Sequence, residues 1–245
     1  MKRTSVLPAI MITAFMTTFM SSALNLSVPT LESFFHVNAA TIQWVVTSYT
    51  ITVAGLSLPL GKLADITGHR RIFLCGIAGF GILCLASAFS YGIGMLIGLR
   101  ALMGACGAML FATNNAILIN AYPKNMRGKV LGYSVSATYI GLTAGPVLGG
   151  ILNNTLGWRS IFLVSVAVSA IAFTAAILSI PKETREVPLD SSDMEAAAFD
   201  FPGAVLYLAA ILASLYGLTN LAAHPHAAWV FAGGVLAMAA FFYYE

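Results

Sequence analysis

The chain alternates between long apolar runs and short polar segments along its whole length. A helix that crosses a bilayer needs about 20 mostly apolar residues, and eight runs are of about that length. These runs are Val6–Val28, Ile42–Leu60, Ile72–Tyr91, Met95–Ile119, Val130–Leu152, Ile161–Ile180, Pro202–Leu221 and Ala227–Tyr244. The pattern therefore predicts an all-α integral membrane protein with eight spanning helices.

The composition agrees with this prediction and excludes several classes of protein. Of the 245 residues, 59% are hydrophobic and only 9% are charged, whereas soluble domains carry about 25% charged residues. These values exclude a soluble enzyme, a disordered regulator and a nucleic-acid binder. The three cysteines lie inside apolar runs without metal-ligand spacing, and no catalytic pattern stands out. We therefore expect no catalysis, no cofactor and no metal site.

The basic residues gather in alternate polar segments. Ten of the twelve precede the first run or lie between runs two and three, four and five, and six and seven. They are Lys2, Arg3, Lys62, Arg70, Arg71, Lys124, Arg127, Lys129, Lys182 and Arg185. Because Lys and Arg favour cytoplasmic loops, we expect a multi-pass protein of the inner (plasma) membrane with both termini in the cytoplasm.

The longest polar stretch divides the predicted helices into six and two. Residues 181–200 contain eight charged side chains and resemble a solvated cytoplasmic linker, with a short surface helix around Ser191–Phe199 as one option. The predicted organisation is therefore a six-helix domain over 1–180, a linker over 181–200, and two further transmembrane helices over 201–245.

One sequence pattern occurs twice, 89 residues apart. The segments Gly61–Leu74 and Gly150–Leu163 both fit G-x-L-x4-G-x-R-x-I-F-L. Three predicted helices separate the copies, so the copies face opposite sides of the membrane. This is expected of an inverted repeat of three plus three helices, and chance similarity between two helix–turn–helix segments is the alternative.

The first copy carries the most specific motif. Its residues Gly61, Asp65, Gly68, Arg70 and Arg71 resemble the signature cytoplasmic loop of the major facilitator superfamily, G-x-L-a-D-r-x-G-r-r. The resemblance implies a conformational switch. Glycines permit a tight turn with close helix approach, and Asp65 can bind free N–H groups at a helix end or pair with Arg70 or Arg71. A basic loop that only fixes topology is the alternative.

Two later segments extend the resemblance. Arg100–Gly104 resembles the helix-four motif R-x-x-q-G of the superfamily. The helix-five motif G-x-x-x-G-P-x-x-G-G, which is associated with antiporters, is matched by Gly141, Gly145, Pro146, Gly149 and Gly150. Glycines at every fourth residue form a smooth stripe for close packing, and the proline predicts a kink. This helix is a candidate pivot, with ordinary small-residue packing as the alternative.

Trp44–Tyr49, Gly157–Phe162 and Asp200–Gly203 are similar to segments of the fourteen-helix drug:proton antiporters in that superfamily. The resemblance implies secondary, proton-coupled efflux of drugs or small amphiphilic molecules by alternating access. Members are much longer, which indicates that a C-terminal half is missing. The implied partners are a small-molecule substrate, protons and the bilayer, without nucleic acid. A truncated or non-transporting subunit that acts in assembly or regulation is the alternative.

Arg100 is the only charge deep inside a predicted span. A charge there costs at least about 2.5–3.5 kcal/mol, so we expect partners, and Ser22 and Asn25 of the first helix are the candidates. Met20 stands where the resemblance implies an acidic residue, which leaves Glu32 at the outer end as the candidate proton carrier. Arg100 and Glu32 form the predicted coupling site, and a structural arginine bonded to carbonyl groups is the alternative.

The polar residues inside the spans also suggest a substrate cavity. Its candidates are Asn25, Tyr49 and Asn114, which lie in the first, second and fourth runs. Each could instead make an interhelical hydrogen bond.

Overall fold

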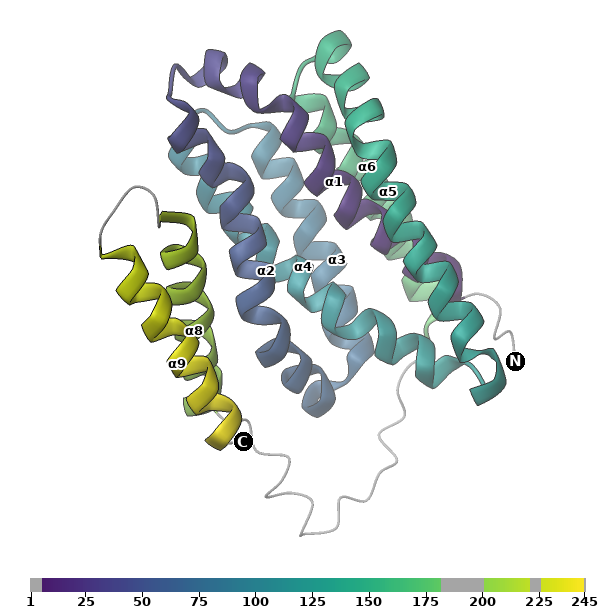
Figure 1. Ribbon diagram of the computed structural model, residues 1–245. Helices are drawn as coiled ribbons and strands as arrows, with labels where there is room; N and C mark the ends of the chain where they lie inside the picture. Colours follow the sequence, from purple (N-terminus) through teal and green to yellow (C-terminus); the bar gives the residue numbers. More distant parts are fainter. Residues whose placement is uncertain (1–5, 182–200, 221–225, 245) are drawn as a thin grey trace.

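The regular structure of the chain is helical throughout the part that can be described. The computed structural model describes residues 6–181, 201–220 and 226–244. Its elements are α1 (Val6–Phe35), α2 (Ala39–Thr67), α3 (His69–Ala88), α4 (Ile93–Ala121), the 3-10 turn η2 (Lys124–Met126), α5 (Arg127–Leu156), α6 (Arg159–Ser179), α8 (Phe201–Asn220) and α9 (Ala227–Tyr244) (Figure 1). The surface helix suggested around Ser191–Phe199 and nearly all of the linker lie outside these ranges.

The predicted all-α membrane fold is confirmed. Helices α1 to α6 are long and apolar enough to cross a membrane, whereas the apolar parts of α8 and α9, Pro202–Leu218 and Ala227–Phe241, are shorter. The bundle helices extend by one to seven residues beyond the predicted runs at most ends, because the polar residues that flank a span continue the helix into the interface.

The two largest errors in the predicted boundaries are equal: α2 ends at Thr67 instead of Leu60, and α1 runs through Pro29 to Phe35 instead of ending at Val28. Leu31 is fully buried, Thr30 accepts a 2.8 Å hydrogen bond from Asn153 of α5, and Phe35 packs on Trp158. This packing keeps the last turns of α1 helical, and it compensates for the helical hydrogen bond that is lost because Pro29 has no backbone N–H.

The helices pack according to the three-plus-three repeat. Helix α1 packs against α5 and α6, α4 packs against α2 and α3, and α3 contacts α6. Exchanging α1 with α4, α2 with α5 and α3 with α6 leaves these contacts unchanged. The structure therefore contains the inverted repeat that the sequence predicted.

Both copies of the repeated pattern end a helix in the same way. Gly68 closes α2 with φ of 102° and Gly157 closes α5 with φ of 81°. Their N–H groups donate to the carbonyls of Ala64 and Asn153, at 2.9 and 3.1 Å. Positive φ values favour glycine. Gly61, in contrast, lies inside α2, so the prediction that it shapes the turn is wrong: the connection between α2 and α3 is Gly68 alone.

Helices α8 and α9 form a hairpin beside α2 (Figure 1). The Tyr207 hydroxyl donates to the carbonyl of Ala54 at 3.4 Å. Leu208 covers Gly55, where an added Cβ would lie 2.5 Å from the Leu208 Cδ1 atom. The additional helices therefore dock on one side of the six-helix bundle.

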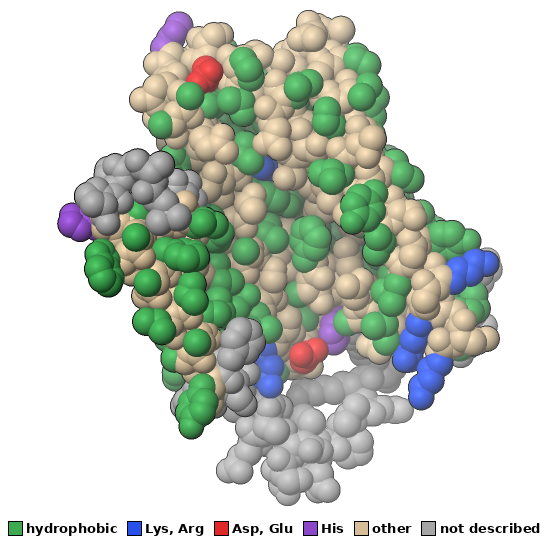
Figure 2. All heavy atoms as spheres, viewed as in Figure 1, with side chains coloured by type: hydrophobic (Ala, Val, Ile, Leu, Met, Phe, Trp, Pro, Cys, Tyr) green, Lys and Arg blue, Asp and Glu red, His purple; other side chains and the backbone are tan. Residues whose placement is uncertain are grey.

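Hydrophobic and basic side chains are distributed differently along the long axis of the bundle. Figure 2 shows hydrophobic side chains over the middle of the visible face, with Lys and Arg mostly at the lower end. Figure 1 places the α2–α3 and α4–α5 turns at that end. The charge distribution is that of a bundle with one strongly basic end.

Candidate functional site

The glycine stripe of α5 forms a close seam with α1. An added Cβ at Gly145 would lie 2.6 Å from the Ser22 Cβ atom, and one at Gly149 would lie 2.5 Å from the Ala23 Cβ atom. Gly141 faces the backbone of Phe15 just as closely. Real Cβ atoms do not approach neighbours to these distances, so the stripe lets the two backbones meet, as small residues do between membrane helices.

Ser22 of α1 also compensates for a defect in α5. Pro146 has no N–H, so the carbonyl of Leu142, four residues earlier, lacks its helical donor. The Ser22 hydroxyl donates to this carbonyl at 2.8 Å. Ser22 therefore packs against Gly145 and donates to the carbonyl that Pro146 leaves without a donor. These two contacts link α1 to the proline of the helix-five motif.

This linkage predicts a specific pattern of stabilities. Ser22→Ala should lower the free energy of unfolding by about 0.6–1.7 kcal/mol, the range for hydrogen bonds between membrane helices. In a Pro146→Ala background, the backbone N–H of residue 146 is restored and can donate to the Leu142 carbonyl. The same Ser22→Ala change should then lower the free energy of unfolding much less. Thermal or denaturant unfolding of the four proteins in detergent measures this double-mutant cycle.

Ser27→Ala is the matched control, because Ser27 is a buried serine of α1 whose hydroxyl bonds only within its own helix, to Ala23 at 3.4 Å. Equal costs of Ser22→Ala in the two backgrounds would refute the link to Pro146.

Arg100 of α4 is fully buried against α2. Its Nε donates to the carbonyl of Val45 at 3.0 Å, and its guanidinium carbon lies 4.4 Å from the centre of the Tyr49 ring. Gly104 makes this approach possible, because an added Cβ there would lie 2.6 Å from the Tyr49 carbonyl oxygen. The prediction that Ser22 and Asn25 hold Arg100 is therefore wrong: a carbonyl and an aromatic face on α2 hold it.

The charge of Arg100 is only partly compensated. Its Nη1 and Nη2 atoms, like the Tyr49 hydroxyl, have no hydrogen-bond partner among the described residues. The ring face supplies a cation–π contact worth about 2 kcal/mol where it is desolvated. The sequence contains no carboxylate inside the first six spans beyond Glu32 and Asp65 at the ends of α1 and α2.

Among the described residues, Arg100 makes no ion pair with Glu32 and no hydrogen bond to Asn25. Glu32 is partly buried near the C-terminal end of α1, and Asn25 is exposed. Met20, at the position where the resemblance implies an acid, is fully buried and accepts a 3.3 Å hydrogen bond from Ser165 of α6. Of the α1 positions singled out in the sequence, Ser22 therefore contacts α5 and Met20 contacts α6, whereas Arg100 contacts α2.

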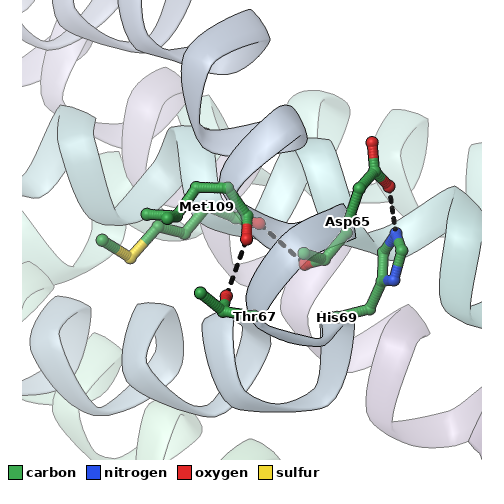
Figure 3. Close-up of polar contacts among 6 residues, drawn as sticks. Asp65, Thr67, His69 and Met109 are labelled. Carbon is green, nitrogen blue, oxygen red and sulfur yellow. Dashed lines mark hydrogen bonds and ion pairs between the residues drawn. The ribbon is translucent and has the colours of Figure 1, made fainter. Parts of the chain in front are cut away.

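Asp65 near the end of α2 pairs with His69, the first residue of α3. The carboxylate and the imidazole Nε2 are 3.2 Å apart (Figure 3), and the Asp65 side chain is 64% exposed. His69 is a partner that the sequence analysis did not name. Arg70 donates to the carbonyls at the end of α6, from Nε to Ile180 at 2.9 Å and from Nη2 to Ile177 at 3.5 Å.

The three predicted cavity residues lie on three different helices and differ in exposure. Tyr49 is buried under Arg100, Asn114 is buried on the same helix as Arg100, and Asn25 is exposed on α1. Two apolar crevices lie where α1, α5 and α6 meet, with volumes of about 220 and 380 Å³. Both are bordered by Phe15 and Val168, and neither is bordered by the three predicted residues.

Comparison with known proteins decides the family. The model of the Major Facilitator Superfamily matches residues 10–245. The chain belongs to this superfamily. Within the superfamily, it is 35% identical over 202 residues to the riboflavin transporter RibZ of Clostridioides difficile, a match that covers 82% of this chain and 43% of that protein.

Other superfamily members are named as exporters. The chain is 34% identical over 236 residues to the cephamycin export protein CmcT of Amycolatopsis lactamdurans, covering 93% of this chain and 46% of that protein. It therefore spans somewhat less than half the length of these curated relatives. A crystal structure of the peptide transporter POT in complex with sulfate matches with a TM-score of 0.66 at 17% identity, covering 88% of this chain and 50% of that one. This last likeness concerns the superfamily fold alone.

Proposed function

We propose that the chain is part of a secondary transporter that expels small amphiphilic molecules in exchange for protons by alternating access. The observation that carries the proposal is the export function named for relatives such as CmcT, which match nearly all of this chain. The α5 stripe with Pro146 seated on α1 supports antiport, and the apolar crevices at α1, α5 and α6 suit the apolar part of an amphiphile.

The placement in the membrane is part of the same proposal. The basic end of the bundle (Figure 2) faces the cytoplasm, since Lys and Arg favour that side, and both termini then lie on the cytoplasmic side of the plasma membrane. Residues 1–180 act as the N-terminal transporter domain, 181–200 as the cytoplasmic linker, and 201–245 as an additional pair of helices. Helices equivalent to the rest of the relatives' length complete the substrate path.

The motif at the α2–α3 junction acts in this scheme as an inner-face switch. Gly68 sets the turn, the Asp65–His69 pair bridges α2 and α3, and Arg70 binds the end of α6. Within this switch, the exposed Asp65–His69 contact can change partners without disturbing the apolar core.

Proton coupling through Glu32 can be tested directly in membrane vesicles. Efflux of a fluorescent amphiphile is measured with and without a pH gradient, using the full-length protein. Efflux by the unsubstituted protein should depend on the gradient. Glu32→Gln should lower gradient-driven efflux at least tenfold and leave binding intact, because the amide cannot carry a proton.

Ser33→Ala, at the exposed neighbouring position, is the control and should behave as the unsubstituted protein. Unchanged gradient-driven efflux in Glu32→Gln would place the proton site elsewhere. Efflux that ignores the gradient in every protein would refute proton antiport itself.

A further inference from the structure

The inverted repeat places the same arginine contact at both ends of the α3–α6 pair. Arg70, in the first turn of α3, donates to Ile180 and Ile177 at the end of α6. Arg159, the first residue of α6, donates from Nε to Ala88 at 2.9 Å and from Nη2 to Ser90 at 3.3 Å, at the end of α3. The repeat offset of 89 maps Arg70 onto Arg159 and Ala88 onto Ile177, so the two contacts are reciprocal.

Each contact uses groups that a helix end leaves available. The last carbonyls of a helix have no intrahelical donor and carry partial negative charge. A guanidinium presents several N–H donors in one plane, and hydrogen bonds from a charged donor are stronger than neutral ones. One arginine can therefore satisfy two carbonyls and fix the end of a neighbouring helix.

The Arg159 contact includes a third helix. The Arg159 guanidinium carbon lies 4.8 Å from the ring centre of Phe34 and 4.5 Å from that of Trp158. Trp158 is only 3% exposed and packs against Phe34, Phe35 and Phe162. Because Phe34 and Phe35 belong to the last turn of α1, Arg159 joins the ends of α1 and α3 to the start of α6.

We propose that Arg159 is a positioning residue for transport, the counterpart of Arg70 at the opposite face. The two arginines lock α3 and α6 together at both membrane faces, and the Arg159 side also holds the end of α1. The six helices then move as one rigid body. A conformational change at one membrane face therefore also moves the helix ends at the other face, because α3 and α6 cannot slide along each other. The transport part of this inference rests on the function proposed above.

Hydrogen–deuterium exchange tests the lock without any reference to transport. Arg159→Gln in the purified protein should speed amide exchange at the α3 end, residues 86–90, about tenfold or more, because a hydrogen bond to a charged group contributes about 1.5–3 kcal/mol and tenfold corresponds to about 1.4 kcal/mol. Exchange at residues 176–180 should change little. Arg70→Gln should give the opposite pattern.

Arg127→Gln is the matched control, because among the described residues the Arg127 Nε bonds to Tyr122 nearby in the chain, at 3.4 Å, and to no other helix; it should leave both segments unchanged. Arg159→Lys, which keeps the charge and one donor, should recover part of the protection. Unchanged exchange at residues 86–90 in Arg159→Gln would overturn the lock.

Transport kinetics test the positioning role. Arg159→Gln should lower the maximal rate of efflux several-fold and leave the substrate KM near its normal value, with partial rescue in Arg159→Lys. Faster exchange with a normal maximal rate would overturn the positioning role. If the unsubstituted protein expels no substrate while the exchange pattern holds, the proposed function fails and the lock stands.

Discussion

Gly145→Leu is expected to abolish transport and to lower the stability of the bundle. The first side-chain atom of any residue at position 145 would lie 2.6 Å from the Ser22 Cβ atom and 3.1 Å from the backbone nitrogen of Ala23. Neither can rotate away, so α1 and α5 must separate. Overpacking of this kind costs typically about 1–3 kcal/mol, and separation also breaks the bond from Ser22 to the Leu142 carbonyl. Efflux assays and thermal unfolding in detergent measure the two effects.

A graded series distinguishes this seam from a general intolerance of α5. Gly145→Ala should give a smaller loss in both measurements, because it adds one methyl group. Gly132→Leu, on the same helix, should be tolerated, since among the described residues an added Cβ there would meet no other helix within 4 Å. Normal transport by Gly145→Leu would show that the seam has no part in conformational exchange. Loss of transport without loss of stability would show that Gly145 is needed for conformational exchange and not for folding.

The helices and their arrangement could be predicted because the bilayer restricts the choices. Without water, the backbone must bond to itself within each span, so apolar length alone indicates a helix. The repeated pattern then fixed the internal symmetry, including the equivalent turns at Gly68 and Gly157. The same alignment paired Arg70 with Arg159, and the structure shows that these two residues make equivalent contacts.

The side-chain partners could not be predicted to the same degree. Arg100 binds a carbonyl at Val45, 55 positions earlier, and a backbone carbonyl has no signature in the sequence. Pro146 does reveal that the Leu142 carbonyl needs a donor, but the choice of Ser22 depends on how α1 is rotated and shifted against α5. The Asp65–His69 pair was missed as well: the two residues lie on different helices, and their contact depends on the turn that Gly68 makes between α2 and α3.

Replacing Arg100 is expected to separate stability from transport. Arg100→Met should leave the stability unchanged or raise it, because a buried charge costs at least about 2.5–3.5 kcal/mol and a hydrophobic residue of similar volume often substitutes for buried charges without loss. The Val45 carbonyl keeps a helical donor, the N–H of Tyr49 four residues later. Efflux should nevertheless fall at least tenfold if the charge takes part in coupling.

Three further variants make this result decisive. Arg100→Lys keeps the charge but not the planar contact with the Tyr49 ring, and should retain part of the activity. Tyr49→Phe keeps the ring that faces the guanidinium and removes only a hydroxyl that has no partner among the described residues, so it should transport normally. Tyr49→Leu removes the ring and should weaken transport. A purely structural arginine would give the opposite outcome, with unfolding and loss of efflux in parallel in Arg100→Met. Such a parallel loss would remove Arg100 from the coupling site and assign it to the packing of α4 on α2.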